Sequence, residues 1–214
     1  MKVKIKTFKS IQEVKNVHKF IIDSFKESMR EELIEPLDRV DLYNNMLNLF
    51  KEKRRLQIYA EMDGQYIGAV VGQVDGFNNN AVKINVIVVK KQLRMKGLAK
   101  DLLKKFEQCC KKEGFSLVKI KENNRANGFI IRAGYIPYLY VSTYQQETVD
   151  RIMDLANYND FKVVRHKIIG ESLIIKLDVE QEAVYDDKKA FKKISPEVQA
   201  EFIFEKLLSK KGQI

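Results

Sequence analysis

The chain changes its hydrophobic period abruptly near its middle. In residues 81–91, AVKINVIVVKK, the odd positions are mixed and the even positions from 82 to 88 are all apolar, as in a strand with one face on a core: Val82, Ile84, Val86 and Val88. After Gly97 the apolar residues follow helical spacing: Leu98, Leu102, Leu103, Phe106, Cys109 and Cys110. The segment RMKGLA, residues 94–99, therefore joins a strand to a helix.

This connection has the composition of an anion-binding turn. Backbone N–H groups converge at a helix N-terminus, where the macrodipole adds partial positive charge. Gly97 allows unusual dihedral angles and a close approach of the backbone, and Ala99 keeps side-chain bulk away. Between Lys90 and Lys112, nine basic residues stand against two acidic ones, a local charge of +7 in a chain of net charge +10. A ligand with several phosphate charges fits these features, and so do an ordinary turn and a solvated helix face.

The segments on either side predict further strands and helices. We expect a strand at 3–8, a helix opened by Ser10, a helix at 38–50 and a hairpin turning at Asp63–Gly64. After the central strand and the helix that Gly114 ends, we expect a strand at 116–121, a short helix within 123–134 and a tyrosine-rich strand at 135–144. This order predicts an α/β chain in which helices cover a mixed sheet.

Two motifs resemble those of the GNAT family of N-acetyltransferases. RMKGLA matches the family's acetyl-CoA motif, Arg/Gln-x-x-Gly-x-Gly/Ala, at the end of the fourth strand. Residues 123–136, NNRANGFIIRAGYI, resemble the second motif, Asn-x-x-Ala-x-x-x-Tyr-x-x-x-Gly-Phe, at Asn123, Ala126, Gly134 and Tyr135. The element order over residues 1–141 is also similar. The resemblance implies the GNAT fold, with an acetyltransferase core at 1–143.

For the cofactor, the resemblance implies acetyl-CoA as co-substrate. Pantetheine would lie along the fourth strand as an added strand, and the amides after Arg94 would hold the pyrophosphate. Asn123 would bond the pantetheine arm or the phosphate side, although its position also suits a helix N-cap. The implied cofactor residues are Ile87, Val88, Val89, Arg94, Met95, Lys96, Gly97, Leu98, Ala99, Lys100, Asn123 and Ala126.

The chain departs from the family pattern at the acid and the base. Ile130 stands where many members carry a tyrosine, and Lys83 stands where some carry a glutamate, with Asn85 nearby on the same face. Tyr138 or Tyr140 could replace the acid, although tyrosines in such a strand more often belong to a core or its rim. The candidate catalytic residues are Lys83, Asn85 and Tyr138. Acidic residues before 39 could attract a cationic amine or supply the base, or form a solvated helix end: Glu27, Glu31, Glu32, Glu35 and Asp38.

The missing base favours weakly basic acceptors. Deprotonating an alkylammonium of pKa ~10.4 costs ~4–5 kcal/mol at pH 7, whereas an α-amino group near ~7.8 costs about 1 kcal/mol. Alignment of amine and thioester can contribute ~7–11 kcal/mol. We therefore expect acetyl-CoA-dependent transfer to a primary amine of a small molecule or peptide, by direct attack in a ternary complex. Ile130 and Lys83 keep open the alternative of a non-catalytic acyl-CoA-binding regulatory module.

Other classes of function have weaker support. A nucleic-acid-binding protein would rest on the basic helix alone, without interleaved aromatic residues, and we expect no nucleic-acid partner. No metal-ligand spacing is present among His18, His166, Cys109 and Cys110. No segment approaches 18 uncharged residues, so we expect no membrane insertion and a cytoplasmic location. The Lys-, Ile- and Asn-rich composition suggests a bacterial source.

Residues 144–214 form a C-terminal α/β extension. We expect a strand pair at 162–169 and 172–179 about Gly170, with residues 161–179 completing the sheet and SLIIKLDV, 172–179, at its seventh position. A final helix at 195–211 would open at Ser195 and Pro196. Its apolar residues should cover the acceptor cleft or form a homodimer contact, with dimerisation favoured: Val198, Phe202, Phe204, Leu207 and Leu208.

Overall fold

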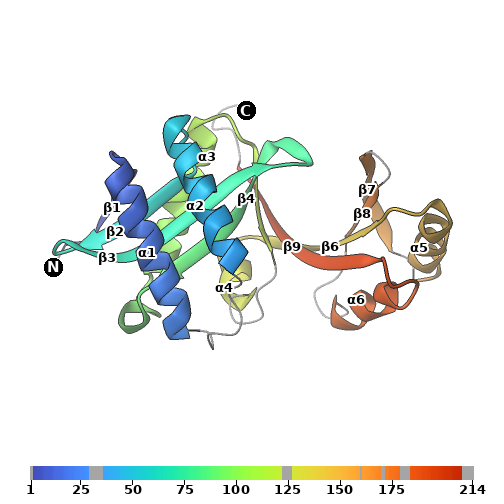
Figure 1. Cartoon of the computed structure of the whole chain (residues 1–214). Helices are drawn as coiled ribbons and strands as arrows, with labels where there is room; N and C mark the ends of the chain where they lie inside the picture. Colours follow the sequence, from blue (N-terminus) through green and yellow to red (C-terminus); the bar gives the residue numbers. More distant parts are fainter. Residues whose placement is uncertain are drawn as a thin grey trace, which may run out of the picture. The chain divides into compact units, whose positions relative to one another are not determined.

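The computed structural model describes the backbone of residues 2–28, 36–121, 127–159, 161–169, 172–178 and 184–208 (Figure 1). Side chains are described for the same residues except 28, 36–38, 165–169, 172–173, 177–178 and 184–187. The chain forms two compact units, Met1–Val118 with Leu207–Ile214, and Lys119–Lys206. The predicted division into residues 1–143 and 144–214 stays a prediction.

The first unit is built on an antiparallel sheet. Its strands pair in the order β1 (Lys4–Lys6), β2 (Gln57–Met62), β3 (Gln65–Asp75) and β4 (Asn78–Val89), and β5 (Leu117–Lys121) follows β4 in the sheet order. The β2–β3 turn has φ of 51° at Asp63 and 78° at Gly64. Positive φ at both central residues is the hairpin geometry that these two residue types favour, which confirms the predicted hairpin.

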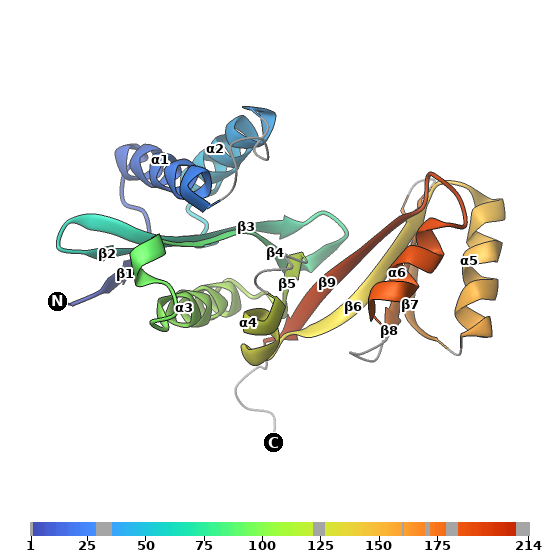
Figure 2. The ribbon, with the colours of Figure 1, turned by 90° about the horizontal axis from the view of Figure 1, so that it is seen from below.

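Helices cover both faces of this sheet. Figure 2 shows α1 (Ile11–Ser28) and α2 (Pro36–Lys51) on one face of β2–β4, and α3 (Leu98–Lys112) on the other. Ser10 opens α1 as expected, since its Oγ accepts a hydrogen bond of 3.2 Å from the Glu13 N–H. The predicted apolar stripe of α3 is buried along its whole length: Leu98, Leu102, Leu103, Phe106, Cys109 and Cys110.

Two glycines of β3 let α3 approach the sheet closely. A Cβ atom at Gly68 would lie 2.7 Å from Leu102 Cδ1, and one at Gly72 would lie 2.7 Å from Phe106 Cζ and 3.1 Å from the Lys83 carbonyl oxygen. Contacts this short exceed what close packing tolerates. The two glycines therefore set the distance between α3 and the strands.

The second unit has its own sheet and core. After β5, the strand order is β9 (Gln199–Leu207), β6 (Ile136–Thr143), β8 (Ser172–Asp178) and β7 (Lys162–Ile169). The unit also contains α4 (Asn127–Arg132), α5 (Gln146–Tyr158) and α6 (Val184–Lys192). One apolar cluster joins α5 and α6 to the strands: Leu139, Val141, Ile152, Ala156, Ile175, Phe191, Val198, Ala200 and Phe202.

The predicted final helix is wrong. Residues 199–207 form strand β9, with Ala200, Phe202 and Phe204 buried and Glu201 and Ile203 half-buried between them. This alternation has the period of a strand, and Phe and Ile favour sheets, which outweighs the helix-start signals of the preceding turn.

Residues 172–178 form a strand of the sheet, β8, but not at the seventh position that we predicted for SLIIKLDV. β9 lies between β5 and β6, whereas β8 lies on the other side of β6, where it pairs with β6 and β7. Of the apolar residues expected to form a homodimer contact, Val198, Phe202, Phe204 and Leu208 are buried within the chain, and Leu207 is exposed.

A buried ion cluster ties four strands of the second unit together. Glu205 of β9 is 6% exposed, and its carboxylate lies 3.7 Å from Lys119 Nζ of β5 and 2.5 Å from Lys176 Nζ of β8. The Tyr140 hydroxyl of β6 donates a hydrogen bond to the same carboxylate. The two ammonium groups and the hydroxyl offset the cost of burying this negative charge.

The described residues contain no helix long and apolar enough to cross a bilayer. Both cysteines are free thiols on the buried side of α3, and burial raises the pKa of Cys109 and of Cys110. Thiolate formation is therefore disfavoured at both residues.

Replacing Gly72 with alanine should lower the free energy of unfolding by ~1–3 kcal/mol, because the added methyl group meets the Phe106 ring and the backbone of β4. Chemical denaturation of both variants measures this. Gly76→Ala is the control, since its Cβ atom would meet nothing within 4 Å, and it should change stability by no more than about 0.5 kcal/mol. Equal effects of the two substitutions would contradict the close approach of α3.

Replacing Glu205 with glutamine should destabilise the protein by about 3–5 kcal/mol, because it leaves two buried ammonium groups without their counterion. Glu201→Gln is the matched control, since Glu201 lies on the same strand and pairs with Lys121 of β5 at 2.6 Å, but the Lys121 and Glu201 side chains are 54% and 40% exposed. Its loss should cost at most ~1 kcal/mol. Urea denaturation measures both effects. Equal unfolding midpoints for the two variants would contradict the stabilising role of the ion cluster.

Candidate functional site

The strand-to-helix connection after β4 contains two left-handed residues. A short 3-10 turn, Lys91–Leu93, follows the strand, Met95 has φ of 62°, and Gly97 has φ of 84° as the N-cap of α3. A bulky side chain at positive φ is strained, and strain of this kind persists mostly at functional sites. The Arg94 Nε donates to the Val89 carbonyl at 3.0 Å, which holds the connection against the end of β4.

The amide groups at the start of α3 face solvent. Residues 94–97 are exposed, Gly97 provides no side-chain cap, and a Cβ atom there would meet nothing within 4 Å. The first four N–H groups of a helix have no partner within it, so those of α3 are available to an anion. The predicted residues Arg94, Met95, Lys96, Gly97, Leu98, Ala99 and Lys100 thus lie together on one anion-binding turn.

The end of β4 extends past its neighbour. The Ser116 N–H, directly before β5, donates to the Asn80 carbonyl at 3.0 Å, near the start of β4. Within the described residues β5 has five residues and β4 has twelve. Because β5 starts beside the beginning of β4, it spans less than half of β4. The edge of β4 around Ile87, Val88 and Val89 lies beyond that span, which suits the addition of an extended ligand.

A β-bulge interrupts the pairing of β4 with β3. Val86 pairs with Val71 and Ile84 pairs with Gly72, which leaves Asn85 as the extra residue. Bulges redirect side chains and are enriched next to active sites. The Asn85 Nδ2 donates to Gln73 Oε1 at 2.9 Å, and Gln73 is the cross-strand partner of Lys83. Asn85 and Lys83 therefore lie on the same face of the sheet, as their spacing of two residues predicts.

That face is the one that α1 and α2 cover. Gly72 points to α3 on the other face, so its neighbour Gln73 points towards α1 and α2. From α2, Asn45 Nδ2 donates to the Gly72 carbonyl at 3.2 Å, and Gln57 of β2 donates to the Met46 carbonyl at 2.9 Å. Four carboxamides, those of Asn45, Gln57, Gln73 and Asn85, therefore form hydrogen bonds at or near the bulge.

The predicted acid lies in the second unit. The Tyr138 ring of β6 has the Lys176 ammonium 3.8 Å from its centroid, and Tyr140 bonds to Glu205. Sequence reasoning missed Glu205, because it placed this residue in a helix. The period-2 alternation of residues 200–205 was the signal that could have identified it. Ile130, at the position of the family's tyrosine, is buried on α4.

Several predicted residues lie outside the described part of the chain. Asn123 and Ala126 fall in the segment between β5 and α4, and Glu31, Glu32 and Glu35 fall between α1 and α2. Of the acidic group, Glu27 is exposed at the end of α1.

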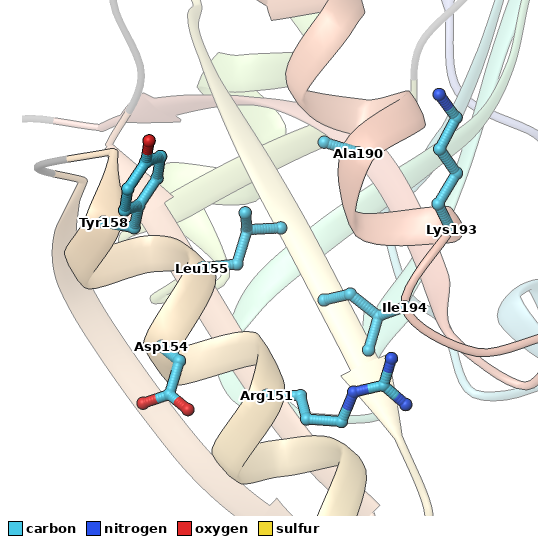
Figure 3. A pocket seen from close by; sticks show the side chains of 7 residues that line it. All are labelled: Arg151, Asp154, Leu155, Tyr158, Ala190, Lys193 and Ile194. Atoms are coloured by element: carbon cyan, nitrogen blue, oxygen red, sulfur yellow. The ribbon is translucent and has the colours of Figure 1, made fainter.

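A pocket of about 470 Å³ lies elsewhere, between α5 and the end of α6. Figure 3 shows its walls, with Leu155 and Ile194 between the two helices and Arg151, Asp154, Tyr158, Ala190 and Lys193 around them. None of the predicted site residues lines it.

Comparisons with known proteins agree with the fold. A structure of yncA from Salmonella typhimurium with its cofactor acetyl-CoA has a TM-score of 0.53 at 12% identity, over 100% of this chain and 98% of that one. A GNAT acetyltransferase from Staphylococcus aureus Mu50 has a TM-score of 0.52 at 14% identity, over 97% and 100%. An N-acetyltransferase from the same organism has a TM-score of 0.52 at 11% identity, over 98% and 100%. At these identities the likeness concerns the fold alone.

The sequence comparisons give one clear match. No curated protein sequence matches the chain significantly. The model of the acetyltransferase (GNAT) family matches residues 19–135, more than half of the chain, including β4, the turn at Gly97 and α3. The chain therefore belongs to the GNAT family of acetyltransferases, whose co-substrate is acetyl-CoA.

Proposed function

We propose that the chain binds acetyl-CoA along the end of β4 and at the N-terminus of α3, and transfers the acetyl group to a primary amine of a small molecule or peptide. The exposed left-handed turn that opens α3, within a local charge of +7, carries this proposal. The structure of yncA with acetyl-CoA supports the same choice of cofactor.

Each part of the cofactor has a matching group. The amides from Met95 to Lys100 would bond the pyrophosphate, and the nearby lysines would add long-range attraction. Backbone groups of Ile87 and Val89 would bond the pantetheine, and an N–H near Val89 would stabilise the oxyanion of the tetrahedral intermediate. Asn123 and Ala126 remain proposed cofactor residues on the second motif.

For the acceptor, we place Lys83 and Asn85 on the amine side of β4, with Tyr138 as the proposed acid. The amine nitrogen attacks the thioester carbon, the C–S bond breaks, and the CoA sulfur takes up a proton. With no glutamate at residue 83, the enzyme depends on acceptors that lose a proton readily and on alignment of the reactants.

Family membership supports catalysis over the alternative of a non-catalytic acyl-CoA-binding module. CoA release with an amine would separate the two. We also propose that the enzyme works in the bacterial cytoplasm, which the composition and the free thiols support. A homodimer stays a prediction.

Acetyl-CoA should raise the melting temperature of the protein, and Gly97→Glu should abolish that rise. Acetyl-CoA at a concentration of 100 times its Kd would add ~2.7 kcal/mol to the free energy of unfolding, which raises the melting temperature by several degrees. A carboxylate at the N-cap of α3 would repel the pyrophosphate and occupy its space.

Gly114→Glu is the matched control. Gly114 follows the other end of α3, has φ of 89°, and has the same open space around it, so its substitution adds the same charge and a similar strain. This variant should keep the full thermal shift with acetyl-CoA. A shift retained in Gly97→Glu would remove the proposed cofactor site.

Asn85→Ala should lower kcat/KM for the amine about 2- to 10-fold, the effect of one lost hydrogen bond, and Tyr138→Phe should lower kcat by ~10²-fold if its hydroxyl protonates the leaving thiolate. Steady-state assays of CoA release measure both. Both variants should keep the acetyl-CoA thermal shift, and Asn79→Ala, at the exposed start of β4, should match the parent protein. Parent-like kinetics in both variants would disprove these assignments.

A further inference from the structure

Lys83 differs from the other sheltered lysines of the chain. Its side chain is half-buried, and it has no hydrogen bond, ion pair or aromatic contact within the described residues. Every other buried or half-buried lysine that the structure describes has an interacting group: Lys6, Lys90, Lys111, Lys119, Lys176, Lys188 and Lys206. Partial loss of hydration without a counterion is unfavourable for an ammonium group.

The surroundings of Lys83 do not neutralise it. Its cross-strand partner Gln73 is bonded to Asn85, and the other polar groups around the bulge are amides. Asp75, further along β3, forms no ion pair with Lys83, and its carboxylate accepts a hydrogen bond from the Phe77 N–H at 3.4 Å. The half-buried Lys83 ammonium thus has no carboxylate partner among the described residues.

The position of this charge relates it to the proposed reaction. Lys83 precedes Ile87 by four residues, or ~13 Å of extended strand, and the lysine side chain spans part of that distance. An acceptor whose amine reaches the thioester near Ile87 and Val89 could therefore place a second group near the Lys83 ammonium. A group of opposite charge would satisfy the ammonium, whereas a second cation would be repelled.

We infer that the acceptor is an amino carboxylate, and that the Lys83 ammonium binds its carboxylate while the amine attacks acetyl-CoA; this inference rests on the proposed function. Lys83 forms only an ion pair, and Asn85 and Gln73 supply amide hydrogen bonds beside it. Polyamines are disfavoured because they would bring a second cation to Lys83, and uncharged acceptors are disfavoured because they leave its ammonium without a counterion.

Pairs of amines that differ only in a carboxylate test this inference. CoA release is measured with lysine against cadaverine, ornithine against putrescine, and β-alanine against ethylamine. The parent enzyme should have a kcat/KM roughly 10- to 100-fold higher for the carboxylated member of at least one pair, the range for a hydrogen bond to a charged group. The pair with the largest ratio reports the distance between amine and carboxylate.

Substitutions at Lys83 separate recognition from folding. Lys83→Met should raise KM for the carboxylated amine by about the factor that separates the kcat/KM values of the two amines in the parent enzyme, with little change for the decarboxylated amine. Lys83→Glu should reverse the preference for the carboxylated amine. Lys83→Arg should retain most of it. Lys4→Glu, an equal charge change on exposed β1, should leave the ratio unaltered, and all four variants should keep the acetyl-CoA thermal shift.

Two outcomes would overturn the inference and differ from each other. A kcat/KM equal or higher for the decarboxylated amine in every pair, or a carboxylate preference that survives Lys83→Glu, would sink the role of Lys83 while acetyl transfer itself stands. CoA release that no amine increases above the rate of hydrolysis would contradict the proposed function, and the inference with it.

Discussion

The antiparallel pairing of β3 with β4 is the constraint on which the candidate site depends. Gly68 and Gly72 of β3 admit α3 against one face, which positions the N-terminus of α3 next to the end of β4. The bulge at Asn85 interrupts the same ladder, and Asn85 is exposed on the same face of the sheet as Lys83. A single pair of strands thus aligns an anion-binding turn, a strand edge and a polar face.

Charge is distributed unequally over these features. Cations gather at the start of α3, where a polyanionic cofactor would bind, while the hydrogen bonds described at the bulge are formed by carboxamides. No carboxylate accepts the Lys83 ammonium among the residues that the structure describes. The proposed acceptor side would therefore suit polycations poorly and would depend on orientation more than on a strong base.

The second unit has a different stabilising principle. One face of its sheet packs an apolar cluster against α5 and α6, whereas Glu205 gathers Lys119, Lys176 and Tyr140 from three other strands. Buried ion clusters of this kind are geometrically demanding, because each charge needs its partner in place. They favour one strand order over others, here β9 between β5 and β6.

The sequence alone determined the local features of this protein. Alternation predicted β4, the stripe from Leu98 to Cys110 predicted α3, Asp63–Gly64 predicted the hairpin, and RMKGLA predicted the turn, because each depends on neighbouring residues. Only the tertiary structure decided the bulge at Asn85, the isolation of Lys83 and the strand at 199–207. These depend on partners far apart in the chain: β3 sets the bulge, and a place between β5 and β6 turns a segment with helix-start signals into a strand.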